Sequence, residues 1–241
     1  MAVNGIGFSG DTSGPVRAAA VVGVVLAGGE GRRMGAGVPK PLRKLGGKTM
    51  VAHVVERLWP QVMDLVVVTN DLTAPGYRAL KVPLVPDPRD VSAAAKREGR
   101  RLGPLAGILA GMEWSLKRHP HAGWILTAPA DVPFLPIDLT VRLCGHMHVP
   151  EADVLTVRRE HAVGIWSVKL VDDLRRAILK EGVRSVQEFA GRHHHAELRW
   201  QGGTAPFANI NTPEELKAAE ARLVQARSRS RQSAAFPRSR N

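Results

Sequence analysis

Glycine and positive charge meet in one loop of this chain, directly after an apolar run at residues 21–26. The run VVGVVL ends in Ala-Gly-Gly, and Arg33 and Lys40 follow before the next apolar stretch. Glycine lets backbone N–H groups turn inward toward an anion, and two cations neutralise its charge. The loop therefore predicts a polyphosphate site. A plain tight turn is the simpler alternative, but the proximity of Arg33 and Lys40 argues against it.

Two common phosphate-binding patterns are absent from the sequence. A P-loop needs a glycine five residues before the triplet GKT at residues 47–49, but that position is Leu42. A dinucleotide fingerprint begins at Gly29, but Met34 stands where its third glycine belongs. The expected polyphosphate site therefore belongs to another class.

Asn70, Asp87 and Asp131 each come soon after a different apolar run. In open α/β sheets ligands bind beyond the carboxyl ends of the strands, so we expect these side chains to share one edge with the glycine loop. A carboxylate at a rigid strand end suits Mg²⁺, which keeps most of its waters, and Asp131 is the candidate ligand. Asp87 lies between two prolines, so an ordinary acidic residue in a turn is an alternative interpretation of it.

The segment NINTPEEL begins at Asn209 and carries a helix start. Thr212 is a good N-cap, Pro213 fits the first helical position and Glu215 completes a capping box. Asn209 and Asn211 therefore have an ordinary interpretation as turn and cap residues beside a role in the site.

Predicted strands and predicted helices alternate along the chain. The predicted strands are Val21–Leu26, Leu65–Thr69, Val82–Val85, Trp124–Ala128, Val154–Arg158 and Val163–Val168. The predicted helices are Met50–Trp59, Pro104–Lys117, Leu139–Met147, Leu170–Lys180, Val186–Ala190 and Pro213–Ala226. The strand runs are continuously apolar, which is typical of a parallel sheet covered on both faces. The expected fold is therefore α/β: a three-layer Rossmann-like arrangement, mostly parallel, with helices on both faces.

Composition limits the domain organisation and the setting. The chain has 241 residues, which suits one folded domain at 19–226 between disordered segments at 1–18 and 227–241. Cys144 is the only cysteine, so a reducing cytoplasm is the expected compartment. No apolar run approaches the roughly 20 residues of a membrane span, and no secretory signal is recognisable.

The net charge of +12 is partly local, because the segment 227–241 contains five arginines and no acid. Nucleic-acid binding is one interpretation of such a balance, and anionic small ligands are another. Aromatic side chains are not interleaved with the basic ones, and no zinc-finger spacing is present, so nucleic acid is not favoured.

The ordered motifs resemble one family. They are LAGGEGRRMG followed by KPL, PDP at 86–88, GPLAGI at 103–108, ADVPF at 130–134 and NINTPEEL at 209–216. Together they resemble the molybdenum cofactor guanylyltransferases of the nucleotidyltransferase superfamily. The resemblance implies transfer of GMP from GTP to the phosphate of molybdopterin, release of pyrophosphate, and a need for Mg²⁺. It also makes molybdoenzymes or their chaperones candidate partners.

The resemblance implies a role for each matching residue. Leu26, Ala27, Gly28 and Gly29 would hold the nucleotide, with Asn70, Asp87 and Asp131. Arg33, Lys40 and Asp131 would be catalytic, with Lys40 on phosphate and Asp131 on Mg²⁺. Asn209 and Asn211 would face the pterin or a second metal. Two positions depart from the family pattern: an expected N-A-N is Val68-Thr69-Asn70, and an expected H-P is His161-Ala162.

The chemistry agrees with this assignment. A phosphomonoester is largely dianionic at pH 7, with a second pKa of about 6, so its attack on the α-phosphorus needs no general base. Catalysis then rests on positioning and charge neutralisation. Three alternatives stay open: a sister enzyme that uses CTP or a sugar or lactyl phosphate, an inactive nucleotide-binding module, and nucleic-acid binding through the basic tail.

Overall fold

The computed structural model describes residues 20–28, 37–146 and 152–235, with side chains up to residue 225. One seven-stranded sheet runs through it in the order β5-β4-β1-β6-β8-β7-β9. The strands are β1 (Val21–Leu26), β4 (Asp64–Val68), β5 (Leu84–Val85), β6 (Trp124–Pro129), β7 (Val154–Val157), β8 (Glu160–Ser167) and β9 (His195–Leu198). All pairs are parallel except the two that β8 makes with β6 and β7. The expected α/β fold with a mostly parallel sheet is confirmed.

The central strand β1 sets the geometry of the sheet edge. It pairs in parallel with β4 and β6, and Leu26 lies level with Val68 on one side and Pro129 on the other. The ladder continues one residue further, because Ala27 N–H donates to the Val68 carbonyl at 2.8 Å and Ala130 N–H donates to the Leu26 carbonyl at 2.9 Å. Three strand ends are therefore held side by side.

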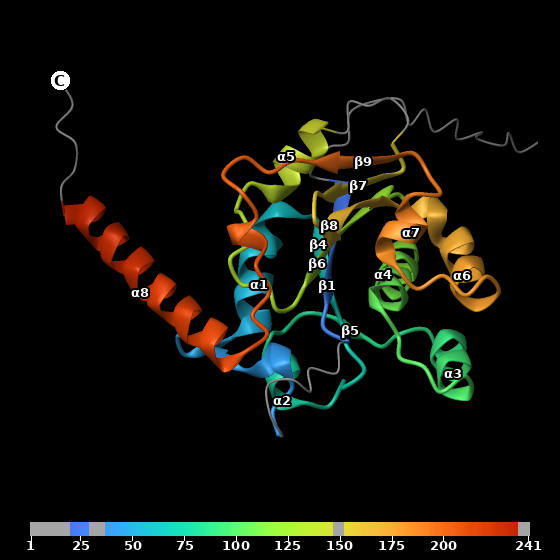
Figure 1. The fold of residues 1–241 in the computed structure, drawn as a ribbon, viewed down its shortest axis with the longest axis horizontal. Coiled ribbons are helices and arrows are strands. Elements are labelled where there is room, and N and C mark those ends of the chain that lie inside the picture. The colour runs from blue at the N-terminus through green and yellow to red at the C-terminus, as the bar shows by residue number, and fades with distance from the viewer. Residues whose placement is uncertain (1–19, 29–36, 147–151, 236–241) are drawn as a thin grey trace, which may run out of the picture.

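Helices cover both faces of the sheet (Figure 1). On one side lie α1 (Met50–Leu58), α5 (Leu139–His146) and α8 (Pro213–Ala235); on the other lie α3 (Arg89–Arg97), α4 (Pro104–Arg118), α6 (Val171–Leu179) and α7 (Val186–Ala190). Two separate apolar cores result, one on each face. Helix α4 packs closely on β1, since a Cβ on Gly111 would lie 2.6 Å from both Val24 methyl groups.

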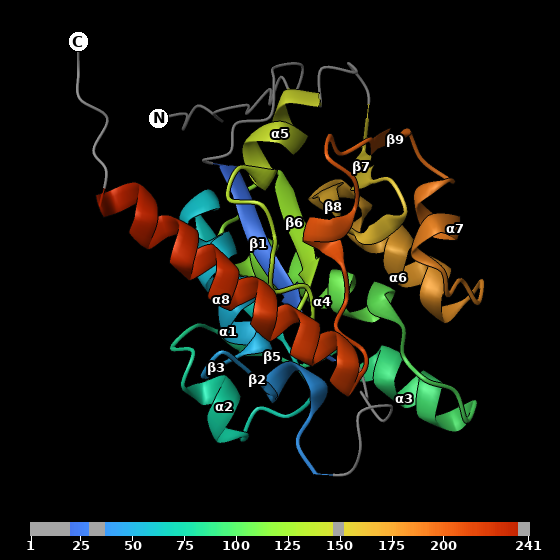
Figure 2. The same cartoon turned by 60° about the vertical axis from the view of Figure 1, so that its left-hand side comes forward.

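A short hairpin precedes α1. It consists of β2 (Lys44–Leu45) and β3 (Lys48–Thr49), joined through Gly46 and Gly47 at φ of 58° and 94°. Positive φ favours glycine, so Gly47 of the GKT triplet lies in a hairpin turn, and Lys48 and Thr49 form β3 rather than a phosphate loop. Figure 2 shows α8 crossing in front of α1 near this hairpin, and Leu45 packs with Ile210 and Ala219.

Several elements differ from the sequence prediction. The strand β9, the short helix α2 (Pro75–Arg78) and the helix α3 were not predicted, because none carries a long apolar run. The strand β8 begins at Glu160 rather than Val163, since its first residues are polar yet paired with β7. Helix α8 continues to Ala235 rather than ending at Ala226, so part of the segment expected to be disordered is helical.

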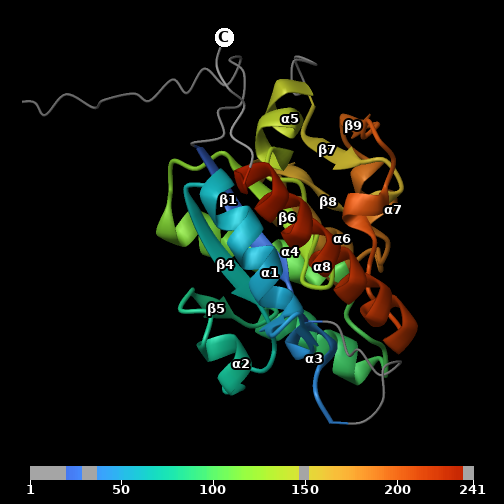
Figure 3. The same ribbon diagram turned by 90° about the vertical axis from the view of Figure 1, so that its left-hand side faces the viewer.

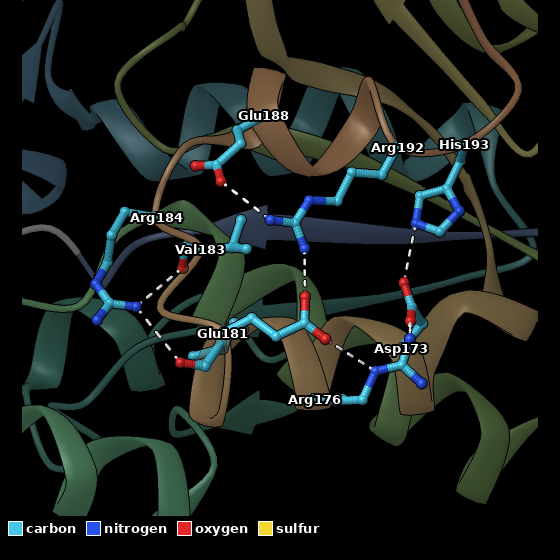
Figure 4. Close-up of polar contacts among 9 residues, drawn as sticks. Asp173, Arg176, Glu181, Val183, Arg184, Glu188, Arg192 and His193 are labelled. Carbon is cyan, nitrogen blue, oxygen red and sulfur yellow. Dashed lines mark hydrogen bonds and ion pairs between the residues drawn. The ribbon is translucent and has the colours of Figure 1, made fainter.

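Ion pairs join the outer ends of α6 and α7 (Figure 4). Glu181 accepts from Arg176 at 3.0 Å and from Arg192 at 2.5 Å, and Arg192 also contacts Glu188 at 3.1 Å. The side chains of these pairs are partly exposed, so each pair contributes little to the stability of the fold. Within the described parts of the chain, no helix combines the length and apolar character needed to cross a bilayer.

Candidate active site

The ammonium group of Lys40 holds two side chains from distant parts of the chain. Its Nζ donates to the carboxylate of Asp131, and at 2.6 Å to Oδ1 of Asn211. Lys40 opens the 3₁₀ helix Lys40–Leu42, Asp131 follows β6, and Asn211 precedes α8. The side chains of Lys40 and Asp131 are only 11% and 19% exposed. The structure thus brings together three residues that the sequence predicted for the site.

Backbone contacts fix the Asn211 segment against the Asp131 loop. The N–H of Ile210 donates to the Asp131 carbonyl at 3.1 Å, and the Ile210 side chain is buried. Glu215 accepts from the Asn211 and Thr212 N–H groups, and its own N–H donates to Thr212 Oγ1 at 3.2 Å. The predicted capping box is confirmed, and it fixes the backbone that presents Asn211 to Lys40.

Two further residues predicted for the site, Asn70 and Asp87, meet beyond the ends of neighbouring strands. Asn70 Nδ2 donates to Asp87 Oδ2 at 2.7 Å, and the Asp87 N–H donates to Asn70 Oδ1 at 3.1 Å. Asp87 is buried, which raises the pKa of its carboxyl, while the hydrogen bond from Asn70 lowers it in part. This reciprocal pairing satisfies the polar atoms of a buried carboxylate, and a role of Asp87 in nucleotide binding stays a prediction.

The Asn70–Asp87 pair faces the glycine turn. A Cβ placed on Gly28 would lie 3.6 Å from Asp87 Oδ2, and one on Gly107 would lie 4.0 Å from Asp87 Oδ1. Gly28 is exposed, whereas Ala27 is buried and its carbonyl accepts from Tyr77 Oη at 3.4 Å. Since the Ala27 N–H and the Leu26 carbonyl serve the sheet, Gly28 is where the backbone first becomes accessible.

The remaining predicted residues are placed differently or not at all. Gly29 and Arg33 lie outside the described residues. Asn209 is exposed, and Lys40 bonds to Asn211 rather than to it. The geometry therefore separates two asparagines that the sequence treated alike.

Glu160 is a further acidic group at this edge that the sequence prediction missed. It opens β8, which runs antiparallel beside β6, so its start lies toward the end of β6. Burial raises the pKa of Glu160, the nearby His161 lowers it, and repulsion from Asp131 raises it. The one sequence signal was its position directly before His161-Ala162, where the family pattern shows H-P.

The oxygen-rich surroundings of Asp131 fit a hard cation. Among the residues that the structure describes, no group of three or more His, Cys, Asp and Glu side chains is arranged around a common point. Mg²⁺ does not require such a group, because one or two carboxylates and several waters satisfy it. Asp131 with the nearby Asn211 oxygen meets this requirement.

Comparisons with known proteins agree with this geometry. Residues 23–197 match the model of the MobA-like NTP transferase domain. A molybdenum cofactor guanylyltransferase of Rhodopseudomonas palustris (strain BisB5) is 40% identical over 82% of this chain and 91% of its own. One from Bradyrhizobium sp. (strain ORS 278) is 41% identical over 83% and 92%.

Structural similarity extends the agreement to the fold. Molybdopterin-guanine dinucleotide biosynthesis protein A from Archaeoglobus fulgidus superposes with a TM-score of 0.63 at 23% identity, covering 85% of this chain and all of that one. The family match spans β1 to β9, and therefore includes Lys40, Asp87 and Asp131. The chain thus belongs to the molybdenum cofactor guanylyltransferases, within the MobA-like NTP transferase family.

Proposed function

We propose that this chain transfers GMP from GTP to the phosphate of molybdopterin, with release of pyrophosphate. The single observation that carries this proposal is the convergence of Lys40, Asp131 and Asn211 at the strand edge, from elements far apart in sequence. Relatives about 40% identical over most of both chains, named for this activity, support it.

The transfer requires one bond to form and one to break. An oxygen of the acceptor phosphate attacks the α-phosphorus of GTP, and the bond from that phosphorus to the bridging oxygen of the β-phosphate breaks. The electron pair leaves on pyrophosphate. Because the acceptor is already largely dianionic, the protein needs to overcome repulsion between anions and not to remove a proton.

Lys40 supplies positive charge at a fixed position. Its hydrogen bonds to Asp131 and Asn211 restrict the ammonium group before substrate arrives, which lowers the reorganisation needed during the reaction. We assign its third N–H donor to a phosphate oxygen. Arg33 and the backbone at Gly28 and Gly29 are proposed to hold the rest of the triphosphate.

Asp131 is the proposed Mg²⁺ ligand, and Asn211 stands beside it. Mg²⁺ bound there supplies charge neutralisation for the phosphates. In the same proposal Asn209, which is exposed next to this group, faces the pterin side.

Base recognition is assigned to Asp87 and Asn70. Guanine presents adjacent N–H donors on its Watson–Crick edge, which a carboxylate oxygen accepts. Asn70 holds Asp87 Oδ2, so Oδ1 is left to meet the base. Cytosine presents a donor next to an acceptor and matches a carboxylate less well, which favours GTP over CTP.

The setting and partners complete the proposal. Cys144, the one cysteine of the sequence, is buried. Burial raises the pKa of its thiol to about 11, so the thiol stays protonated and unreactive, and a reducing cytoplasm is the proposed compartment. Molybdoenzymes or their chaperones are the proposed recipients of the product.

The deciding experiment mixes the purified chain with GTP, molybdopterin and Mg²⁺ and follows pyrophosphate release. Parallel thermal unfolding with equal concentrations of GTP, CTP and UTP ranks the nucleotides, because a ligand that binds only the folded state raises stability more the more tightly it binds. Release with GTP and strongest stabilisation by GTP are expected. Strong stabilisation by CTP alone would contradict the guanylyl assignment, and absence of release with every nucleotide would favour an inactive binding module.

A further inference from the structure

A cavity of about 350 Å³ lies between α1, α5 and α8 and the loop that follows β6. Arg57 of α1, Arg142 of α5 and Arg222 of α8 line it (Figure 3 shows the three helices on this side of the sheet). It shares no lining residue with the Lys40 and Asp87 groups. Its volume lies at the lower end of the range for small-molecule sites.

The walls of this cavity carry an excess of positive charge. Three guanidinium groups line it, against the single carboxylate of Asp138. Asp138 is already paired with Arg142 at 2.7 Å. Within the described parts of the chain, neither Arg57 nor Arg222 forms an ion pair with a carboxylate. Two uncompensated cations therefore remain in one small space.

Backbone carbonyls hold these two cations in place. Arg57 Nη1 donates to the Leu135 carbonyl at 2.9 Å, and Arg222 Nη1 donates to the Ala205 carbonyl at 3.1 Å. Each guanidinium has five N–H donors, so most remain for another partner. Burial lowers the pKa of Arg57, and repulsion from Arg222 lowers it further, so the two groups are close enough to oppose each other.

Aromatic side chains set the orientation of the guanidinium planes. Arg222 stacks on Phe134 with 4.1 Å from the guanidinium carbon to the ring centroid, and Arg142 lies 4.7 Å from Trp200. Stacking occupies the faces of a guanidinium and leaves its in-plane N–H groups to bind an oxyanion in a bidentate manner. Pro136, Pro206 and Leu223 supply an apolar surround that strengthens such contacts.

We propose that this cavity is a second anion site, separate from the transfer site, that binds the diphosphate or phosphate group of a small molecule between Arg57 and Arg222. A diphosphate suits it best, because its two charged ends match two guanidinium groups held apart by repulsion. The anion would relieve that repulsion, and the cavity is too small for a folded segment of protein.

Isothermal titration with inorganic pyrophosphate, in the absence of molybdopterin, tests this site. We expect the full chain to bind pyrophosphate at two sites, and the Lys40→Ala variant to keep the cavity site. Replacing both arginines, Arg57→Gln with Arg222→Gln, is expected to weaken binding at that remaining site at least tenfold. The control changes Lys117 and Arg118 to Gln, because both are exposed at the end of α4 and their removal lowers net charge equally.

Two outcomes overturn the proposal. One is unchanged pyrophosphate affinity in the arginine variant, and the other is an equal loss in the α4 control, which would show general charge attraction. If the Gln variant does not fold, Arg57→Lys with Arg222→Lys keeps both charges but loses the planar donors. Its affinity must then fall several-fold, and an unchanged value refutes the site. These measurements do not depend on GMP transfer, so their failure leaves the proposed function standing.

Discussion

The ammonium group of Lys40 and the carboxylate of Asp131 form a largely buried ion pair across 91 positions of the chain. Both groups stand where the proposed triphosphate and Mg²⁺ would bind, so each holds the other in position before substrate arrives. Substitution of Lys40 and substitution of Asp131 are expected to have different effects, because Lys40 supplies positive charge and Asp131 supplies an oxygen ligand.

Replacing Lys40 by Ala removes a preorganised donor to phosphate. We expect GMP transfer to fall about 100- to 1,000-fold, as is typical when one such donor is lost. Steady-state pyrophosphate release measures this effect. Lys44→Ala is the matched control, because Lys44 is exposed on the adjacent hairpin and its loss is expected to leave the rate unchanged. Equal loss in both variants would contradict a specific role for Lys40.

Replacing Asp131 by Ala removes the proposed Mg²⁺ ligand and leaves the Lys40 ammonium with Asn211. We expect transfer to be abolished while the circular dichroism spectrum stays native. Magnesium titrations of activity measure the effect, with Asp172→Asn on the exposed face of α6 as a control. Full activity of the Ala variant would refute the assignment of this carboxylate.

Replacing Asp87 by Asn changes an acceptor that is proposed to meet guanine. An amide can turn N–H donors toward the donors of the base, so we expect GTP binding about 10- to 100-fold weaker, consistent with roughly 1–3 kcal/mol for an unsatisfied buried polar group. CTP binding should change much less. The ratio of the two KM values tests this, and a parallel loss for both nucleotides would contradict base recognition.

The raised pKa of Asp87 also predicts a dependence on pH. Because its folded-state pKa lies above the unfolded value near 3.8, the folded state binds the extra proton. The stabilisation from this group is therefore complete below that value and is lost as pH rises through the folded-state pKa. GTP affinity should change in the opposite sense and weaken as Asp87 is protonated. Affinity and unfolding profiles measured against pH check both signs, and Asp87→Asn should flatten each of them.

Replacing Gly111 by Ala tests the packing that positions β1. The added methyl group would overlap Val24, so we expect a loss of about 1–3 kcal/mol in the free energy of unfolding. Gly145→Ala in α5 is the control, because its Cβ would meet no atom within 4 Å and alanine favours helix. Urea denaturation measures both, and equal stability of the two variants would refute the close approach of α4.

The sequence was sufficient to predict the residues that sit at the ends of parallel strands. Asn70, Asp87 and Asp131 follow apolar runs, and parallel strands bring their carboxyl ends to one edge, so their proximity followed from topology. Glu160 could not be predicted this way, because only an antiparallel strand brings its beginning to that edge. The joining of Lys40 with Asn211 depends on packing between the hairpin and α8, which no local pattern encodes.

The elements that were missed share a physical cause. The strand β9 has mixed polarity, and its place beside β7 comes from pairing and not from an apolar run of its own. Helix α3 buries only Val91, Ala94 and Ala95, so its many charged residues hide its amphipathic pattern. The cavity lined by Arg57 and Arg222 lies between helices whose relative placement is set by the core, and residue spacing alone gave no indication of it.

The hydrogen bond from Lys40 to Asn211 spans 171 positions. During synthesis on the ribosome, β1, the hairpin and Asp131 emerge well before the segment that contains Asn211. The nascent chain therefore acquires the complete group only once the segment that contains Asn211 has emerged, which follows every strand of the sheet from β1 to β9. Fraying of the first turn of α8 would likewise remove Asn211 from Lys40 while the sheet stays folded. Activity can therefore be lost without global unfolding.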